Sequence, residues 1–99
     1  MALTIKWTKQ AELSFANIID YLGNNFTERE IKNFISKSNS VIAQISVTPL
    51  MFIHSGKKQN ISEAVIAPQC LLIYRIEKKH IDLLAFFDTR QHPKKKPKR

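Results

Sequence analysis

The sequence predicts an α+β fold in which a helical hairpin packs on one face of a four-stranded, mostly antiparallel, twisted sheet. Two observations lead to this prediction. Stretches with strand and helix periodicity follow one another in the order strand, helix, helix, strand, strand, strand. The links between the two helices and between the last three strands are short, which makes consecutive elements antiparallel neighbours. One layer of helices on one sheet then buries the apolar faces of both.

The first strand and the first helix are predicted near the N-terminus. Apolar and polar side chains alternate over residues 3–7, as in a strand with one buried face, and we expect Trp7 to lie in the core. Thr8 is a residue type that caps helices. Apolar residues then recur at spacings of three and four, and Gly23 suits the positive φ that ends many helices. The spacing therefore predicts a helix over about residues 9–22.

The second helix has the clearest start signal in the sequence. Thr27 and Glu30 have the spacing of a capping box, in which each side chain bonds to the backbone N–H of the other residue. Phe26 and Ile31 flank this pair at the positions of a hydrophobic staple. The apolar stripe then continues as far as Val47, where a Thr-Pro pair disfavours further helix.

Three β-rich runs follow a loop, at residues 61–67, 71–77 and 81–87. Turns of two or three residues join them, and such short turns require antiparallel pairing. Tyr74 is flanked by apolar residues, so we expect it in the core with its hydroxyl group bonded at the edge.

Composition and cysteine usage narrow the class of protein. With 99 residues and 43% hydrophobic residues, the chain fits one small globular domain. Cys70 is the only cysteine, which excludes an internal disulfide and a cysteine-rich metal site, and we expect it to be buried and inert. The N-terminus has no apolar segment of signal-peptide type, and no stretch is long enough to span a membrane. These features predict a cytoplasmic protein.

The positive charge is concentrated at the C-terminus. The net charge is +8, and the tail over residues 94–99 supplies five of the 16 basic residues with no acidic residue among them. Residues 1–93 are therefore predicted to form the domain, and the tail to be disordered when unbound. A basic tail can attract nucleic acid or an acidic protein segment, or can serve solubility alone.

Metal and cofactor chemistry have no sequence support. The three histidines and the scattered acidic residues show none of the spacings of known metal motifs, and a glycine-rich phosphate loop is absent because the chain has two glycines. We therefore expect no metal and no cofactor, and we assign no role to His54 or His80.

Basic residues on and after the last two strands are the remaining candidates for chemistry. Arg75, Arg90 and His92 could together support metal-free cleavage of RNA, which needs a base, a cation and an acid. The sequence alone does not place Arg75 within reach of Arg90. Arg75 could instead form an ion pair with Glu77 or Asp88, and we expect Asp88 to fix the backbone after the last strand.

Several segments together resemble the RelE/ParE superfamily of bacterial toxins over residues 3–95. They are IKWTKQAELSFANIIDYL, SVTPLMF and LLIYRIEKKHIDLLAFFDTRQHP, with the strand, helical hairpin and three-strand order. The resemblance implies the toxin of a type II toxin–antitoxin system, of the kind also described as plasmid stabilisation proteins. It also implies a cognate antitoxin, which is expected to be encoded adjacently and whose C-terminal segment wraps the toxin.

The superfamily contains two activities, and the sequence is more similar to the ParE-like group. The resemblance implies that ParE-like members inhibit growth through DNA gyrase, whereas RelE-like members cut mRNA on the ribosome, often with a C-terminal tyrosine. No tyrosine follows Tyr74, and Asn60, Ser62 and Glu63 occupy a region where RelE-like members often have a basic residue. The RelE-like ribonuclease, using Arg75, Arg90 and His92, stays open as the alternative.

Binding residues are predicted at two places. We expect the C-terminal basic residues to contact the target or a nucleic acid: Arg90, Lys94, Lys95 and Lys96. Three phenylalanines could form a groove for an antitoxin helix, or could equally belong to the core: Phe26, Phe34 and Phe52. A nucleic-acid-binding module that uses only the basic tail is a third hypothesis.

Overall fold

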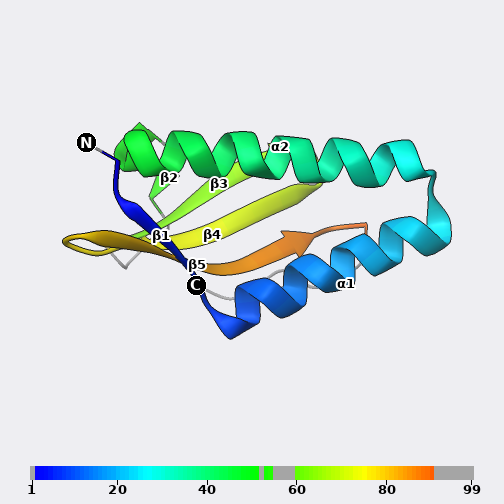
Figure 1. Cartoon of the computed structure of the whole chain (residues 1–99), viewed down its shortest axis with the longest axis horizontal. Coiled ribbons are helices and arrows are strands. Elements are labelled where there is room, and N and C mark those ends of the chain that lie inside the picture. The colour runs from blue at the N-terminus through cyan, green and yellow to red at the C-terminus, as the bar shows by residue number, and fades with distance from the viewer. Residues whose placement is uncertain (1, 52, 55–59, 91–99) are drawn as a thin grey trace.

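The computed structural model describes residues 2–51, 53–54 and 60–90, and within them it has the predicted element order (Figure 1). The elements are β1 (Thr4–Trp7), α1 (Lys9–Asn25), α2 (Glu28–Val47), the short 3-10 helix η1 (Pro49–Met51), β2 (Ile53–His54), β3 (Ile61–Ala67), β4 (Cys70–Ile76) and β5 (His80–Asp88). The three predicted C-terminal strands agree with β3, β4 and β5 to within a residue at each end. The α+β prediction is confirmed.

The sheet is open and mostly antiparallel. Its strand order is β1-β5-β4-β3-β2, in which β1 runs parallel to β5 and every other described pair is antiparallel. The two-residue strand β2 adds to the four predicted strands at one edge. Parallel pairing of β1 with β5 is possible because the whole helical hairpin lies between them in the sequence, which is the long crossover that parallel neighbours need.

The two helices form an antiparallel hairpin on one face of the sheet (Figure 1). Side chains of β4 alternate, so that Leu72 and Tyr74 are completely buried on the helix side, whereas Leu71 and Ile73 are half-buried on the other face. Ile18 and Leu22 of α1 and the apolar side of α2 complete the core. The other face of the sheet carries no described helix.

Helix α1 is longer than predicted. It continues through Gly23 to Asn25, and Gly23 does not adopt a positive φ, so the prediction of a glycine end was wrong. The last turn is closed differently: the Phe26 N–H donates to the Leu22 carbonyl at 2.8 Å, and the Asn25 side chain donates to the Tyr21 carbonyl at 2.9 Å. These bonds satisfy terminal carbonyl groups that would otherwise lack partners.

The N-terminal caps of the two helices differ. Thr8 caps α1 as predicted, since its hydroxyl oxygen accepts from the Ala11 N–H at 3.2 Å and its hydroxyl group donates to the Leu83 carbonyl at 2.7 Å. Thr27 precedes α2, but its side chain makes no cap bond, so the predicted capping box does not form. The Thr27 carbonyl instead accepts from the Glu30 N–H at 3.0 Å. Helix α2 ends at Val47, as predicted.

An aromatic cluster joins β1, both helices and β5. Phe15 packs within ring-centroid distances of 5.3 Å from Trp7, 5.2 Å from Phe34 and 5.0 Å from Phe86. Trp7 also stacks on Phe86, yet 37% of it remains exposed, so it lies at the edge of the core and not inside it as predicted. It is on β1, which is an edge strand of the described sheet.

Tyr74 and Cys70 are both buried, as predicted. The Tyr74 hydroxyl group donates to the Pro49 carbonyl at 2.6 Å, which ties β4 to η1. Burial raises the pKa of the Cys70 thiol to about 12, so this thiol stays protonated at neutral pH. None of the helices in the described ranges is long and apolar enough to cross a membrane.

Candidate functional site

The exit of β5 is organised by one carboxylate. Asp88 is 1% exposed, and its Oδ1 accepts from the Arg90 backbone N–H at 2.8 Å and from Arg90 Nε at 3.1 Å, while its Oδ2 accepts from Nη2 at 2.7 Å. The expectation that Asp88 fixes the backbone after the last strand is confirmed. These bonds raise the pKa of Arg90 further above its ordinary value, with the Asp88 hydrogen bond as the main cause.

Arg90 also contacts the link between the helices. Its guanidinium carbon lies 5.5 Å from the centre of the Phe26 ring, within the range of a cation–π contact. Phe26 is 43% exposed and belongs to the short connection between α1 and α2. Arg90 therefore joins the end of the sheet to the tip of the helical hairpin.

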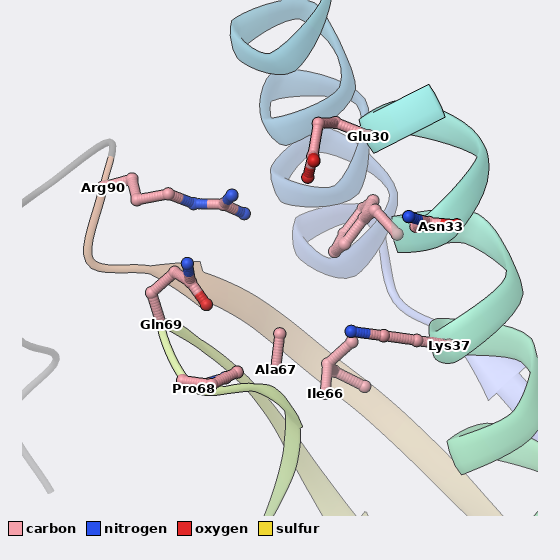
Figure 2. Close-up of a pocket in the computed structure, with 9 residues that line it drawn as sticks. Glu30, Asn33, Lys37, Ile66, Ala67, Pro68, Gln69 and Arg90 are labelled. Carbon is pink, nitrogen blue, oxygen red and sulfur yellow. The ribbon is translucent and has the colours of Figure 1, made fainter. Parts of the chain in front are cut away.

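A cavity of about 280 Å³ lies beside Arg90, between α2 and the turn from β3 to β4 (Figure 2). Figure 2 shows the Glu30 and Arg90 side chains approaching from opposite sides, with Lys37 deeper along α2. The lining combines apolar and polar groups: Glu30, Asn33, Phe34, Lys37, Ile66, Ala67, Pro68, Gln69 and Arg90. Such a lining can hold an apolar side chain with a polar end.

A second polar cluster lies at the other end of the β4–β5 hairpin. Arg75 forms ion pairs with Glu77 through Nε and with Asp82 through Nη2, both at 2.8 Å. Nε2 of His80 lies 3.2 Å from Asp82 Oδ1. The hydrogen bond from Arg75, followed by the positive charges nearby, lowers the pKa of Asp82. The predicted Arg75–Glu77 pair is confirmed, and Asp82 rather than Asp88 is the second partner.

Comparisons with known proteins identify the fold. No family model and no curated protein matches the sequence. Among solved structures, the chromosomal ParDE TA system from P. aeruginosa matches with a TM-score of 0.72 and 12% identity, over 88% of this chain and 96% of that chain. The E. coli DinJ-YafQ toxin-antitoxin complex matches with a TM-score of 0.64 and 11% identity, over 92% and 97%. The YoeB dimer from Staphylococcus aureus matches with a TM-score of 0.62 and 18% identity, over 88% and 97%.

The chain has the fold of RelE/ParE-type toxins. The fold that the sequence resemblance implied is thereby confirmed. At these identities the likeness extends to the arrangement of helices and strands, and the residues of the site have to be judged on their own geometry.

On this RelE/ParE-type fold, the two described residues of the set proposed for RNA cleavage, Arg75 and Arg90, do not come together. Arg75 pairs with Asp82 in the β4–β5 register, whereas Cys70 pairs with Asp88 at the other end. At about 3.4 Å per residue, the six steps from Asp82 to Asp88 separate these ends by roughly 20 Å. Arg75 and Arg90 thus belong to different surfaces. His92 and the tail residues Lys94, Lys95 and Lys96 lie outside the described residues.

The three phenylalanines predicted to bind an antitoxin have different environments. Phe26 is exposed and contacts Arg90. Phe34 is 5% exposed and packs on Phe15 and Phe86 in the core, although it also reaches the cavity. Phe52 lies outside the described residues. Of the two described phenylalanines, Phe26 is therefore the better placed for a partner.

His80 and Asp82 were not singled out from the sequence. They point to the same face of β5 because they are two residues apart, and the strand register places Arg75 opposite Asp82. The signal was present as a His-x-Asp pattern in a strand, but the register that adds Arg75 could not be read from it. Within the described ranges, no group of three or more His, Cys, Asp or Glu side chains could hold a metal ion.

Proposed function

We propose that the chain is the toxin of a type II toxin–antitoxin system, that it is ParE-like, and that it inhibits growth by acting on DNA gyrase until a cognate antitoxin neutralises it. The observation that carries the proposal is the match to the P. aeruginosa ParDE TA system, which covers 88% of this chain and 96% of that chain at a TM-score of 0.72. The sequence resemblance over residues 3–95 supports it independently.

The geometry of Arg75 and Arg90 argues against RNA cleavage by these two residues together. Metal-free cleavage needs a base, a cation and an acid within reach of one phosphate. The β4–β5 register places Arg75 and Arg90 at opposite ends, and the Arg90 guanidinium is already bonded to Asp88. In the described part of the chain, neither a histidine nor a tyrosine lines the cavity beside Arg90.

The cavity and the Arg90–Phe26 contact support an antitoxin-binding role for this end of the molecule. An exposed aromatic ring beside a guanidinium group and a partly apolar cavity is the kind of surface on which protein partners find anchor points. Several similar structures are toxin-antitoxin complexes by their titles, among them the E. coli DinJ-YafQ complex. In this proposal the antitoxin side chains enter the cavity, and the basic tail adds attraction to a polyanion.

Expression of the chain in a bacterial host tests the gyrase proposal. The expected result is growth arrest together with accumulated cleaved gyrase–DNA complexes, both relieved when an adjacent acidic reading frame is co-expressed. Arg90→Ala should reduce toxicity, whereas Arg29→Ala, which removes an exposed arginine of α2, should not. Unaffected supercoiling at toxic doses would exclude gyrase as the target.

A RelE-like ribosome-dependent endoribonuclease is the second candidate. The histidine, carboxylate and arginine cluster at His80, Asp82 and Arg75 favours it, since these groups can move a proton and bind a phosphate. Primer extension on mRNA after induction should then show new 5′ ends. If the originally predicted residues act, Arg90→Ala abolishes these ends. If the new 5′ ends are still formed by Arg90→Ala but are lost in His80→Ala, the cluster of Arg75, His80 and Asp82 performs the chemistry.

A further inference from the structure

The open face of the sheet carries a concentration of positive charge at the end far from Arg90. Three outward positions form a row across three strands, because Lys6 of β1 pairs with Asp82 of β5, and Asp82 pairs with Arg75 of β4. The neighbours of Lys6 on β1 face the other way: Ile5 packs against the core and Trp7 against Phe86. Lys6 is therefore on the face without helices, and it is exposed.

The adjoining β4–β5 turn adds more basic groups. Lys78 and Lys79 are exposed in this turn, and His80 follows them. We call the set Lys6, Arg75, Lys78, Lys79 and His80 the hairpin-end surface. Two acidic residues, Glu77 and Asp82, lie within it, against four side chains that are always positive and one histidine.

The two carboxylates of this surface are already engaged. Glu77 pairs with Arg75, and Asp82 pairs with both Arg75 and His80. Among the described residues, no ion pair within 4 Å involves any of the three lysines. Lys6 is near enough to Asp82 for its charge to contribute to the lowered pKa of that carboxyl group, but no ion pair with a described residue fixes any of the three ammonium groups, so they can bind an anion from outside the chain.

The spacing and the character of the surface point to a phosphate backbone. Neighbouring strands lie about 4.8 Å apart, so Lys6 and Arg75, with β5 between them, are separated by about 10 Å. Lysine side chains are flexible point charges that bind phosphates without reading bases. Among its five members the only aromatic ring is the imidazole of His80, which is paired with Asp82, and the surface has no Phe, Tyr or Trp side chain on which a base could stack. We propose that the hairpin-end surface binds the phosphate backbone of a nucleic acid independently of sequence.

A nucleic acid fits this surface better than an acidic protein segment does. Protein partners are held mainly by apolar and aromatic anchors. The exposed large apolar side chains among the described residues lie elsewhere: Leu13, Phe26, Val47 and Leu50 are in or next to helices, Val65 is near the other end of β3, and Trp7 faces the helix side. This inference goes beyond the proposed gyrase function, since neither gyrase inhibition nor antitoxin binding at the Arg90 end requires the hairpin-end surface. It shares Arg75 and His80 with the second candidate function, and the variants below leave both residues in place.

Two triple variants of the full chain test the proposal. The first replaces the three lysines of the surface, as Lys6→Gln, Lys78→Gln and Lys79→Gln. The control removes the same charge from exposed positions of α1 and α2, as Lys9→Gln, Arg29→Gln and Lys32→Gln. Both keep the C-terminal tail, so its contribution cancels in the comparison. Equal urea midpoints of the two variants and the parent chain check that all three are folded.

Fluorescence anisotropy with a short DNA duplex and a short single-stranded RNA is measured at salt concentrations between about 50 and 200 mM. We expect the surface variant to bind about tenfold or more weakly and to lose two to three units of the slope of log affinity against log salt, at roughly 0.7–0.9 per phosphate contact. The control should keep most of the slope. If the surface variant binds both the DNA duplex and the RNA more weakly, the surface recognises the phosphate backbone that they share. If it binds only one of them more weakly, the surface is specific for that nucleic acid.

Two results would overturn the proposal. Equal weakening by the surface variant and the control would show that only net charge matters. Unchanged nucleic-acid binding by the surface variant, with loss of binding to a polyglutamate peptide, would assign the surface to an acidic protein segment.

Discussion

The carboxylate of Asp88 accepts three hydrogen bonds from Arg90, one from its backbone N–H and two from its guanidinium group. Asp88 is almost completely buried, so the ion pair is partly shielded from water. The pair fixes the direction in which the chain leaves β5 and points the Arg90 guanidinium at Phe26. The geometry of the candidate site therefore depends on a residue that does not line the cavity.

Asp88→Asn should destabilise the protein and disturb the site together. The amide keeps the shape but removes the charge and at least one acceptor from a buried position, which should lower the free energy of unfolding by about 1–3 kcal/mol. Urea denaturation measures the change. Asp20→Asn, at an exposed position of α1, serves as the control and should leave the midpoint unchanged. An Asp88→Asn midpoint equal to that of the parent chain would contradict the structural role assigned to this pair.

Tyr74→Phe should cost stability without opening a large space. The Tyr74 hydroxyl group is buried and donates to the Pro49 carbonyl at 2.6 Å, so its removal leaves that acceptor with one bond fewer. We expect a loss of about 1 kcal/mol in the free energy of unfolding, from denaturation in urea. Tyr21→Phe, at a less buried position in α1, should change the free energy of unfolding less. An unchanged free energy of unfolding in Tyr74→Phe would mean that the hydroxyl bond to η1 does not stabilise the fold.

Periodicity was sufficient to predict the fold because each element has a consistent apolar pattern. The end of α2 at Val47 and the strands β3 to β5 followed from local chemistry that the tertiary structure does not override. The end of α1 was not predicted correctly. The helix continues past Gly23, and the hydrogen bond from the Phe26 N–H to the Leu22 carbonyl closes its last turn. A glycine does not fix the end of a helix, because other hydrogen bonds of similar strength can satisfy the terminal carbonyl groups.

The site was harder to predict because it depends on register. The β4–β5 pairing places Arg75 opposite Asp82, and its register shifts between Ile73 and Tyr74, where Leu84 of β5 is skipped. A one-residue difference in pairing moves every side chain to the other face, so sequence patterns cannot specify such contacts. The sequence identified Arg90 and Asp88 as notable, but the contact between Arg90 and Phe26 joins residues that are far apart in the chain.

The stability of the β4–β5 hairpin should depend on pH through Asp82. The hydrogen bond from Arg75 is the main cause that lowers the pKa of Asp82 in the folded chain. A carboxyl group with a lowered folded pKa stabilises the fold above its ordinary pKa of about 3.9, and this contribution is lost as the pH falls below that value towards the folded pKa. Asp82→Asn lacks the contribution at every pH. Urea denaturation at a series of pH values should show the two midpoints converging in acid, and a constant difference would contradict the assignment.

The Cys70 thiol should be unreactive in the folded protein. It is buried, and its pKa is raised to about 12, chiefly by burial and then by the Asp88 charge. Because the thiolate is the reactive form, alkylation by iodoacetamide at about pH 8 should be much slower in the folded chain than in urea. The raised pKa also means that the thiol favours the fold below the ordinary thiol pKa, and that this contribution is lost as the pH rises towards 12. Alkylation at equal rates in both states would show that Cys70 is accessible.

Phe26 and Phe34 provide the sharpest test of which aromatic residues belong to the core and which to a partner surface. Phe34 is 5% exposed and packs on Phe15 and Phe86, so Phe34→Ala should lower the free energy of unfolding by about 3–5 kcal/mol. Phe26 is 43% exposed, and its described ring contacts are Tyr21 and Arg90. Phe26→Ala should therefore cost about 1 kcal/mol or less, the value of an exposed cation–π contact.

The affinity for the co-expressed antitoxin should depend more on Phe26 than on Phe34, which is the reverse of their order for stability. Phe26→Ala should weaken the complex about tenfold or more, because truncation of an anchor residue at an interface commonly costs at least 1–2 kcal/mol. Phe34→Leu, which keeps most of the buried volume, should leave the affinity close to that of the parent chain, because the side chain contributes chiefly to the core. Calorimetric titration of each folded variant with the antitoxin measures both affinities. If Phe34→Leu weakened the complex while Phe26→Ala did not, the cavity would anchor the partner without the tip of the helical hairpin, because Phe34 is the only one of the two that lines the cavity.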